Sequence, residues 1–156
     1  YARPLSENKT MRDAIRDAVN GGLPTVAECG GFLYLHTTLT DREGHSYPMV
    51  GVLPGKCFDT GHLVRFGYIE LEESSGYFMS HGSSIRAHEF HYYDSEDNGA
   101  DCIATKPVTG RNYPCIHVGE SHWYGFPHLY YPSCPEFAER FVENAKKFSK
   151  SGKDVL

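Results

Sequence analysis

The stretch Pro24-Thr25-Val26-Ala27-Glu28-Cys29-Gly30-Gly31-Phe32-Leu33-Tyr34-Leu35 decides the fold, because an apolar strand here turns directly into an apolar helix. The Cys-Gly-Gly corner would project the Cys29 side chain clear of the sheet, as the nucleophile does at the strand-to-helix elbow of hydrolases. We expect the N–H groups at the start of the helix to lower the pKa of the Cys29 thiol. Gly30 and Gly31 leave room for a substrate and accept backbone angles that a Cβ would forbid. We therefore interpret Cys29 as a nucleophile, with a buried structural cysteine as the alternative.

Outward from this corner, helix and strand signals alternate at first and strand signals follow. An amphipathic helix is predicted over residues 5–20, a parallel strand over 24–28 and a helix from Gly30 to about Thr37. A polar turn (40–46) and a short extended piece (47–53) ending at Pro54-Gly55 follow. Strands are predicted over 63–71, 85–93, 102–106 and 115–118, and a helix begins at Pro135. We predict one α/β domain over residues 1–156, with an antiparallel extension and a flexible tail at 149–156.

The composition excludes several classes of partner. The 156 residues carry a formal charge of −5, which argues against nucleic acid or an anionic membrane as a ligand. No apolar run approaches membrane-spanning length. Five cysteines at irregular spacing do not form a disulfide framework, so we expect a reducing, cytoplasmic setting. Gly55-Lys56-Cys57 lacks the other residues of a phosphate-binding loop, so we expect no bound nucleotide in this chain.

Four ordered motifs resemble one family. The segment Ala27–Leu35 resembles the nucleophile motif in the glutaminase domain of cobyrinic acid a,c-diamide synthases, a cobalamin-pathway branch of the class I glutamine amidotransferases. The stretches Arg65–Glu70 and Arg86–Tyr92 match the same family in order, and Gly125–Ser133 resembles the segment with its catalytic histidine. The resemblance extends from about Leu5 to about Val142. It implies a three-layer, flavodoxin-like mixed sheet of the class I amidotransferase type, here without its first strands.

The resemblance also implies a function, a ligase reaction and several partners. It implies the glutaminase portion of an ATP-dependent synthase, which hydrolyses glutamine through a Cys thioester. The ammonia would amidate the corrin carboxylates a and c in cobalamin biosynthesis. ATP, Mg²⁺ and cobyrinic acid would bind the protein's own N-terminal synthetase domain, and no cofactor is expected in this chain. The alternatives are a non-catalytic docking fragment, an amidase or thiol hydrolase of related architecture, and another tetrapyrrole as acceptor, and a homodimer stays open.

By the same resemblance, His128 is the catalytic base, and the Gly30 amide is one oxyanion donor. The second donor would come from a glycine-rich loop that is missing before Tyr1, so we expect an N-terminally truncated fragment with weak or no activity. Most class I amidotransferases have Glu two residues after the histidine, whereas this sequence has Tyr130. We therefore predict a Cys–His pair, oriented by Glu89 or a backbone carbonyl, with Glu28 as a further candidate.

A glutamine pocket is predicted from the residues around these motifs. Its candidates are Glu28, Gly31, Arg86, Glu89 and His91, with structural hydrogen bonding as the alternative role for the last three. A metal site is not expected, because His88 and Glu89 would point to opposite faces of a regular strand. His117 and His122 have no Cys or carboxylate at ligand spacing. The four remaining cysteines are interpreted as packing residues.

Overall fold

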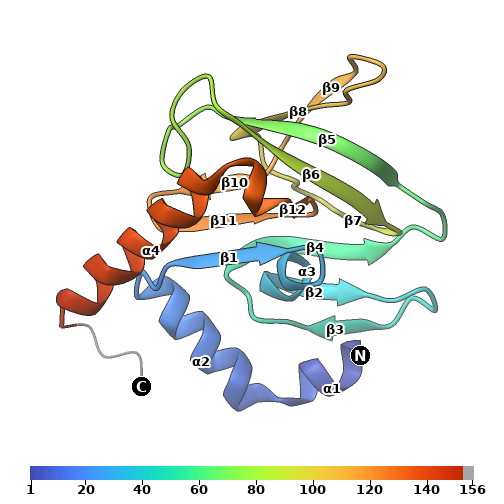
Figure 1. Cartoon of the computed structure of the whole chain (residues 1–156). Helices are drawn as coiled ribbons and strands as arrows, with labels where there is room; N and C mark the ends of the chain where they lie inside the picture. The colour runs from blue at the N-terminus through green and yellow to red at the C-terminus, as the bar shows by residue number, and fades with distance from the viewer. Residues whose placement is uncertain (153–156) are drawn as a thin grey trace.

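The computed structural model describes residues 1–152, and its strands form three sheets (Figure 1). The first sheet contains the predicted strand before Cys29. In this sheet β1 (Thr25–Glu28) pairs in parallel with β11 (His122–Gly125), and β10 (His117–Gly119) pairs antiparallel with β11. Glu28, the last residue of β1, lies opposite Gly125. The end of β1 therefore lies beside the segment of chain that leads to His128.

The second sheet has five antiparallel strands, in the order β12 (His128–Leu129), β6 (Ser84–His91), β5 (Arg65–Glu73), β8 (Cys102–Thr105) and β9 (Asn112–Cys115). The alternation predicted around residues 85–93 is present in β6, where Ala87 and Glu89 are buried and His88 lies on the opposite face. His128 lies directly opposite His88 in the register, so both side chains share the outer face of the sheet.

The third sheet differs most from the sequence prediction. Its order is β3 (Ser46–Pro48), β2 (His36–Thr40), β4 (Leu53–Asp59) and β7 (Tyr93–Ser95), with β2 and β4 parallel. The predicted helix to Thr37 is too long, since α3 (Gly30–Leu35) ends earlier and β2 follows at once. The β-branched residues Thr37 and Thr38 favour this strand. The predicted end at Pro54-Gly55 is also wrong, because β4 continues through both residues to pair with β2.

Four α-helices and one 3₁₀ helix (Tyr131–Ser133) surround these sheets. The single helix predicted over residues 5–20 is two helices, α1 (Ala2–Glu7) and α2 (Lys9–Asn20), which meet at Asn8. The side-chain oxygen of Asn8 accepts a hydrogen bond from the Met11 N–H at 3.1 Å and so caps α2. The predicted C-terminal helix is confirmed as α4 (Pro135–Lys150), which includes the first two residues of the expected tail. Residues 153–156 of that tail lie outside the described residues.

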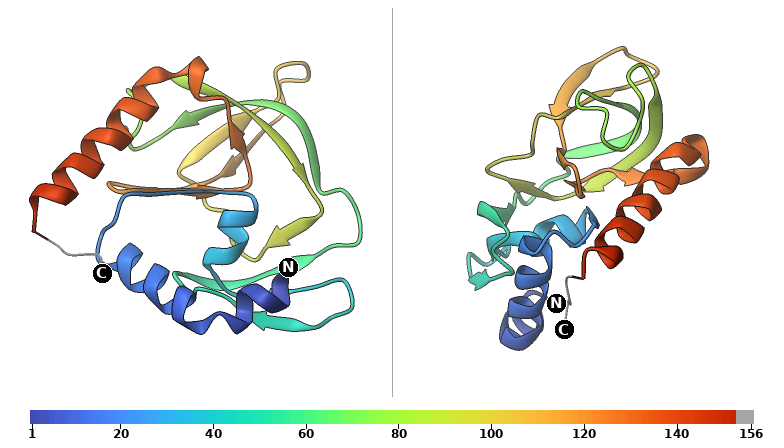
Figure 2. Two further views of the ribbon diagram at one scale, coloured as in Figure 1. Left: turned by 60° about the horizontal axis from the view of Figure 1, so that its bottom comes forward. Right: turned by 90° about the vertical axis from the view of Figure 1, so that its left-hand side faces the viewer.

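The end of β1 is held between two buried clusters. One cluster contains Trp123 together with Phe137 of α4, and the other contains Phe32 of α3. Val26 packs against the first cluster and Ala27 belongs to the second. The five-stranded sheet lies at one end of the molecule and α1 and α2 at the other (Figures 1 and 2). The predicted α/β class with an antiparallel extension is thus confirmed, with the strands divided among three sheets.

Two further features concern the cysteines and the length and polarity of the helices. Within residues 1–152 all five cysteines are free, and the four apart from Cys29 are buried, as predicted for packing residues. No helix in this part of the chain combines the length and apolar character that a bilayer crossing needs.

Candidate active site

Cys29 occupies the corner between β1 and α3 in a backbone conformation that L-amino acids rarely adopt. Its φ is 46° and its ψ is −105°, outside the three main allowed regions. The Cys29 N–H donates a hydrogen bond to the Gly125 carbonyl at 2.8 Å, and its own carbonyl accepts one from Leu33 at 2.9 Å. Strained backbone of this kind is concentrated at functional sites, and a strand-to-helix corner is where hydrolases hold their nucleophile.

The electrostatics of the Cys29 thiol differ from the expectation. Burial raises its pKa above the ordinary value, the backbone N–H of Gly30 opposes this rise, and the negative charge of Glu28 adds to it. The lowered pKa expected from the helix N-terminus is therefore wrong. With only six residues, α3 aligns few peptide dipoles, and they do not outweigh the cost of burying a thiolate. Cys29 rests as a thiol and needs a base before it can act as a nucleophile.

His128 is half-exposed and lies close to Glu28, the last residue of β1. Its Nδ1 is 3.7 Å from Oε2 of Glu28, a distance suited to an ion pair when the imidazole is protonated. The other Glu28 oxygen accepts a 2.5 Å hydrogen bond from the Tyr131 hydroxyl, 103 residues away in the sequence. Burial and this bond raise the pKa of Tyr131. Glu28, the residue before Cys29, therefore links the end of β1 to the segment that contains His128 and Tyr131.

Glu89, which the sequence offered as the residue that orients His128, lies on the other side of the five-stranded sheet. It is fully buried on the inner face, whereas His128 is on the outer face. Within residues 1–152 its hydrogen-bond and ion-pair partners include neither His128 nor Cys29; the partners are Arg65, His91, Lys106 and Tyr113. The carboxylate beside His128 is that of Glu28, so Glu28 is the candidate for the orienting role.

An open pocket of about 500 Å³ lies on the outer face of the sheet beside His128. The side chains that line it include Arg86, whose guanidinium lies 5.7 Å from the Tyr130 ring centroid, together with Tyr68 and His88. Cys29 is not part of this lining. A larger hollow of about 590 Å³ lies against the C-terminal part of α4 and contains none of the predicted site residues, so its size alone gives it no role.

The remaining predicted pocket residues separate into two groups. A Cβ placed on Gly30 would meet nothing within 4 Å, so the space beside the residue directly after Cys29 is open. At Gly31 the Cβ would lie 3.6 Å from the Ala27 side chain, in ordinary contact with β1. His91 is buried and stacks on Phe126, with ring centroids 3.9 Å apart. Gly30 and Gly31 therefore belong to the Cys29 corner, whereas His91 packs inside the molecule.

Tyr131 is a site residue that sequence reasoning missed. It lies within the Gly125–Ser133 motif, where no site role is predicted for it, yet its hydroxyl donates a hydrogen bond to the carboxylate of Glu28. Its position three residues after His128 was the only signal available. No local pattern indicates that it reaches a strand 103 residues away.

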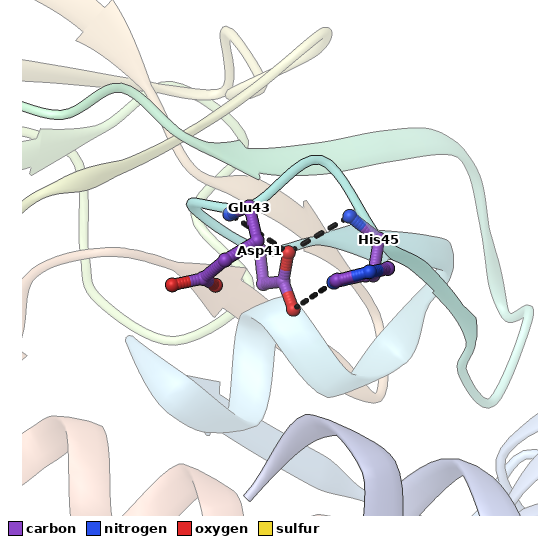
Figure 3. A group of neighbouring side chains, drawn as sticks. All are labelled: Asp41, Glu43 and His45. Atoms are coloured by element: carbon purple, nitrogen blue, oxygen red, sulfur yellow. Dashed lines mark hydrogen bonds and ion pairs between the residues drawn. The ribbon is translucent and has the colours of Figure 1, made fainter.

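A group of potential metal ligands lies in the turn between β2 and β3. Within residues 1–152, the only three Asp, Glu, His or Cys side chains close enough to share an ion are Asp41, Glu43 and His45 (Figure 3). One Asp41 oxygen accepts the backbone N–H groups of Glu43 and His45 at 3.0 and 2.8 Å, and the other accepts the Tyr47 hydroxyl at 3.0 Å. These bonds close the turn and account for the cluster, so we assign it no metal.

The sequence is similar to those of several known proteins. The chain is 35% identical over 153 residues to cobyrinate a,c-diamide synthase of Caldanaerobacter subterraneus, covering 96% of this chain and 34% of that protein. It is 30% identical to the Priestia megaterium protein of the same name, and the match covers 100% of this chain and 34% of that protein. It is 31% identical to the Thermoplasma volcanium protein of that name, and the match covers 96% of this chain and 33% of that protein. The chain spans about one third of the length of these relatives.

The family model for the CobB/CobQ-like glutamine amidotransferase domain matches residues 2–117, a range that includes Cys29 and ends before His128. The class I amidotransferase-like fold expected from the four motifs is consistent with this match and with the mixed α/β architecture. The chain therefore belongs to the family of CobB/CobQ-like glutamine amidotransferase domains.

Proposed function

We propose that this chain is the glutamine-hydrolysing part of a cytoplasmic cobyrinate a,c-diamide synthase and supplies ammonia for amidation of the corrin carboxylates a and c. The observation that carries the proposal is the strained Cys29 corner, with Glu28 bridging from it to His128. Membership of the amidotransferase family supports glutamine as the substrate, and the names of the relatives support the acceptor.

In this proposal, ATP, Mg²⁺ and cobyrinic acid bind the part of such a synthase that lies outside this chain. The relatives are about three times as long as the segment that matches, which leaves room for a synthetase portion. Gly55 and Lys56 lie inside β4, where Lys56 pairs with Glu96 at 3.4 Å, so they form no phosphate-binding loop. The chain's own contribution is then the release of ammonia.

The first half of the reaction forms a thioester. His128 takes the thiol proton of Cys29, the sulfur bonds to the amide carbon of glutamine, and the carbonyl electron pair moves to oxygen. The Gly30 N–H donates a hydrogen bond to this oxyanion. When the intermediate collapses, the C–N bond breaks, and His128 returns its proton to the leaving nitrogen, which departs as ammonia.

The second half releases glutamate. His128 takes a proton from water, the resulting hydroxide attacks the thioester carbon, and the C–S bond breaks as His128 returns the proton to the sulfur, which restores the Cys29 thiol. The imidazole is positively charged each time it has accepted a proton, and the Glu28 carboxylate at 3.7 Å stabilises it in that form. Tyr131 holds Glu28 in place. The raised pKa of the thiol is the reason that the reaction needs His128.

A glutamine-analogue alkylator, 6-diazo-5-oxonorleucine, tests the proposal. We expect mass spectrometry to find the label on Cys29, because the other four cysteines are buried. His128→Gln should slow both labelling and glutamine hydrolysis by about 10² or more, the usual loss on removing a general base. His81→Gln, which changes an exposed histidine without a hydrogen bond in the described part of the chain, is the matched control. Absence of label in the unmodified chain would refute the proposal and favour a docking role.

A further inference from the structure

Three cationic side chains converge on a small hollow at one end of the five-stranded sheet. The cavity has a volume of about 220 Å³, and its lining residues are Val64, Arg65, Phe66, Lys106, Arg111 and Tyr113. These residues belong to the start of β5 and to the β8–β9 hairpin, two elements labelled in Figure 1. The chain as a whole carries a formal charge of −5, so this accumulation of positive charge runs against the general balance. A concave site of one sign concentrates ligands of the opposite sign.

The positive charge in the cavity is only partly neutralised. Nη1 of Arg65 and Nζ of Lys106 each lie 3.6 Å from a carboxylate oxygen of the fully buried Glu89. Within residues 1–152, Arg111 makes no ion pair and no side-chain hydrogen bond, and Glu89 is the only carboxylate paired with the other two. Three cations against one carboxylate leave a net charge of +2 at the cavity.

Two of the three cations, Arg65 and Lys106, are held in position by neighbouring groups, and both guanidinium groups of the cavity lack hydrogen-bond acceptors in the described part of the chain. The Arg65 guanidinium lies over the Tyr113 ring, 3.9 Å from its centroid, and the Tyr113 hydroxyl is hydrogen-bonded to Glu89. Lys106 is anchored by donating to the Phe66 carbonyl at 3.0 Å. In the described part of the chain neither Arg65 nor Arg111 donates a side-chain hydrogen bond. Two guanidinium groups with free N–H groups match the oxygens of a tetrahedral anion, which they bind in bidentate fashion.

We propose that this cavity binds a phosphate group. A phosphate carries close to two negative charges near neutral pH and so balances the excess of +2, whereas a carboxylate supplies only one. The cavity is smaller than the roughly 300 Å³ at which drug-sized ligand sites begin, so it accepts inorganic phosphate or the terminal phosphate of a larger molecule. Its lining includes neither Cys29 nor His128, and the proposal does not depend on glutamine hydrolysis.

Titration calorimetry of the 156-residue chain with inorganic phosphate at low ionic strength tests this site. We expect saturable binding to one site, which Arg111→Gln weakens about tenfold or more through loss of a charge-assisted donor. Arg111 is exposed and makes no side-chain bonds in the described residues, so the variant should fold normally, as circular dichroism would verify. Arg42→Gln, at an exposed arginine in the turn between β2 and β3, is the matched control and should bind as the unmodified chain does.

A second titration with ADP separates the two sources of a phosphate group. If ADP and inorganic phosphate bind with equal affinity, the ligand of the cavity is free phosphate. If ADP binds more tightly, and Arg111→Gln weakens its binding too, the ligand is a nucleotide. The proposal is overturned if neither probe saturates the site, if Arg111→Gln binds phosphate as tightly as the unmodified chain, or if acetate, a simple carboxylate, binds as tightly as phosphate.

Discussion

Glycine at position 29 should give a more stable protein than alanine, which is the reverse of the usual order of these two residues. The backbone of Cys29 has φ 46° and ψ −105°, and holding a residue with a Cβ in such a region costs about 1–3 kcal/mol. Glycine avoids this strain but loses about 0.5–1 kcal/mol to the greater freedom of the unfolded chain. The difference leaves Cys29→Gly more stable than Cys29→Ala by about 1 kcal/mol, or roughly 2–4 °C in Tm for a chain of this size.

Urea denaturation of the two variants measures this difference, and Cys102 provides the control. Cys102 lies in strand β8 and has no positive φ, so alanine is accommodated there without backbone strain. There the alanine variant should be more stable than the glycine variant by at least about 0.5–1 kcal/mol. If Cys29→Ala matched or exceeded Cys29→Gly in its free energy of unfolding, the strained elbow would be refuted, and with it the main structural argument for Cys29 as a nucleophile.

Three further predictions concern titratable groups. Burial and the charge of Glu28 raise the pKa of Cys29, so the rate of Cys29 alkylation by iodoacetamide should still increase above pH 9. Glu28→Gln should move this pH–rate profile to lower pH. A rate that reaches its plateau below pH 8 in the unmodified chain would contradict the prediction. Burial lowers the pKa of His36, so the unfolded state binds its proton more readily and stability should fall as pH drops below about 6.5. Urea midpoints at pH 7 and pH 5 measure this loss, which should be smaller in His36→Gln. Glu89→Ala removes the carboxylate that pairs with the partly exposed Arg65 and Lys106 and leaves the Tyr113 hydroxyl without its acceptor. It should reduce the free energy of unfolding by about 2 kcal/mol in urea titrations, and a loss below about 1 kcal/mol would show that these contacts contribute little.

The sequence by itself determined the corner on which the site is built. The apolar run, the adjacent glycines and the helical spacing after Cys29 are local features, and local features act over a few residues whatever the rest of the chain does. The alternation in β6 was predicted for the same reason, since strand periodicity depends only on the pleat. The failures of prediction at Thr37 and Pro54-Gly55 came where β2 and β4, far apart in sequence, pair with one another.

Only the tertiary structure decided which side chains meet. Alternation places Glu89 and His88 on opposite faces, but the packing of the sheet on its core decided that Glu89 is inside and so cannot reach His128. The link from Glu28 to Tyr131 spans 103 residues and depends on the parallel pairing of β1 with β11. The pKa of Cys29 rises because desolvation depends on every atom packed around the thiol, a quantity that no stretch of sequence contains.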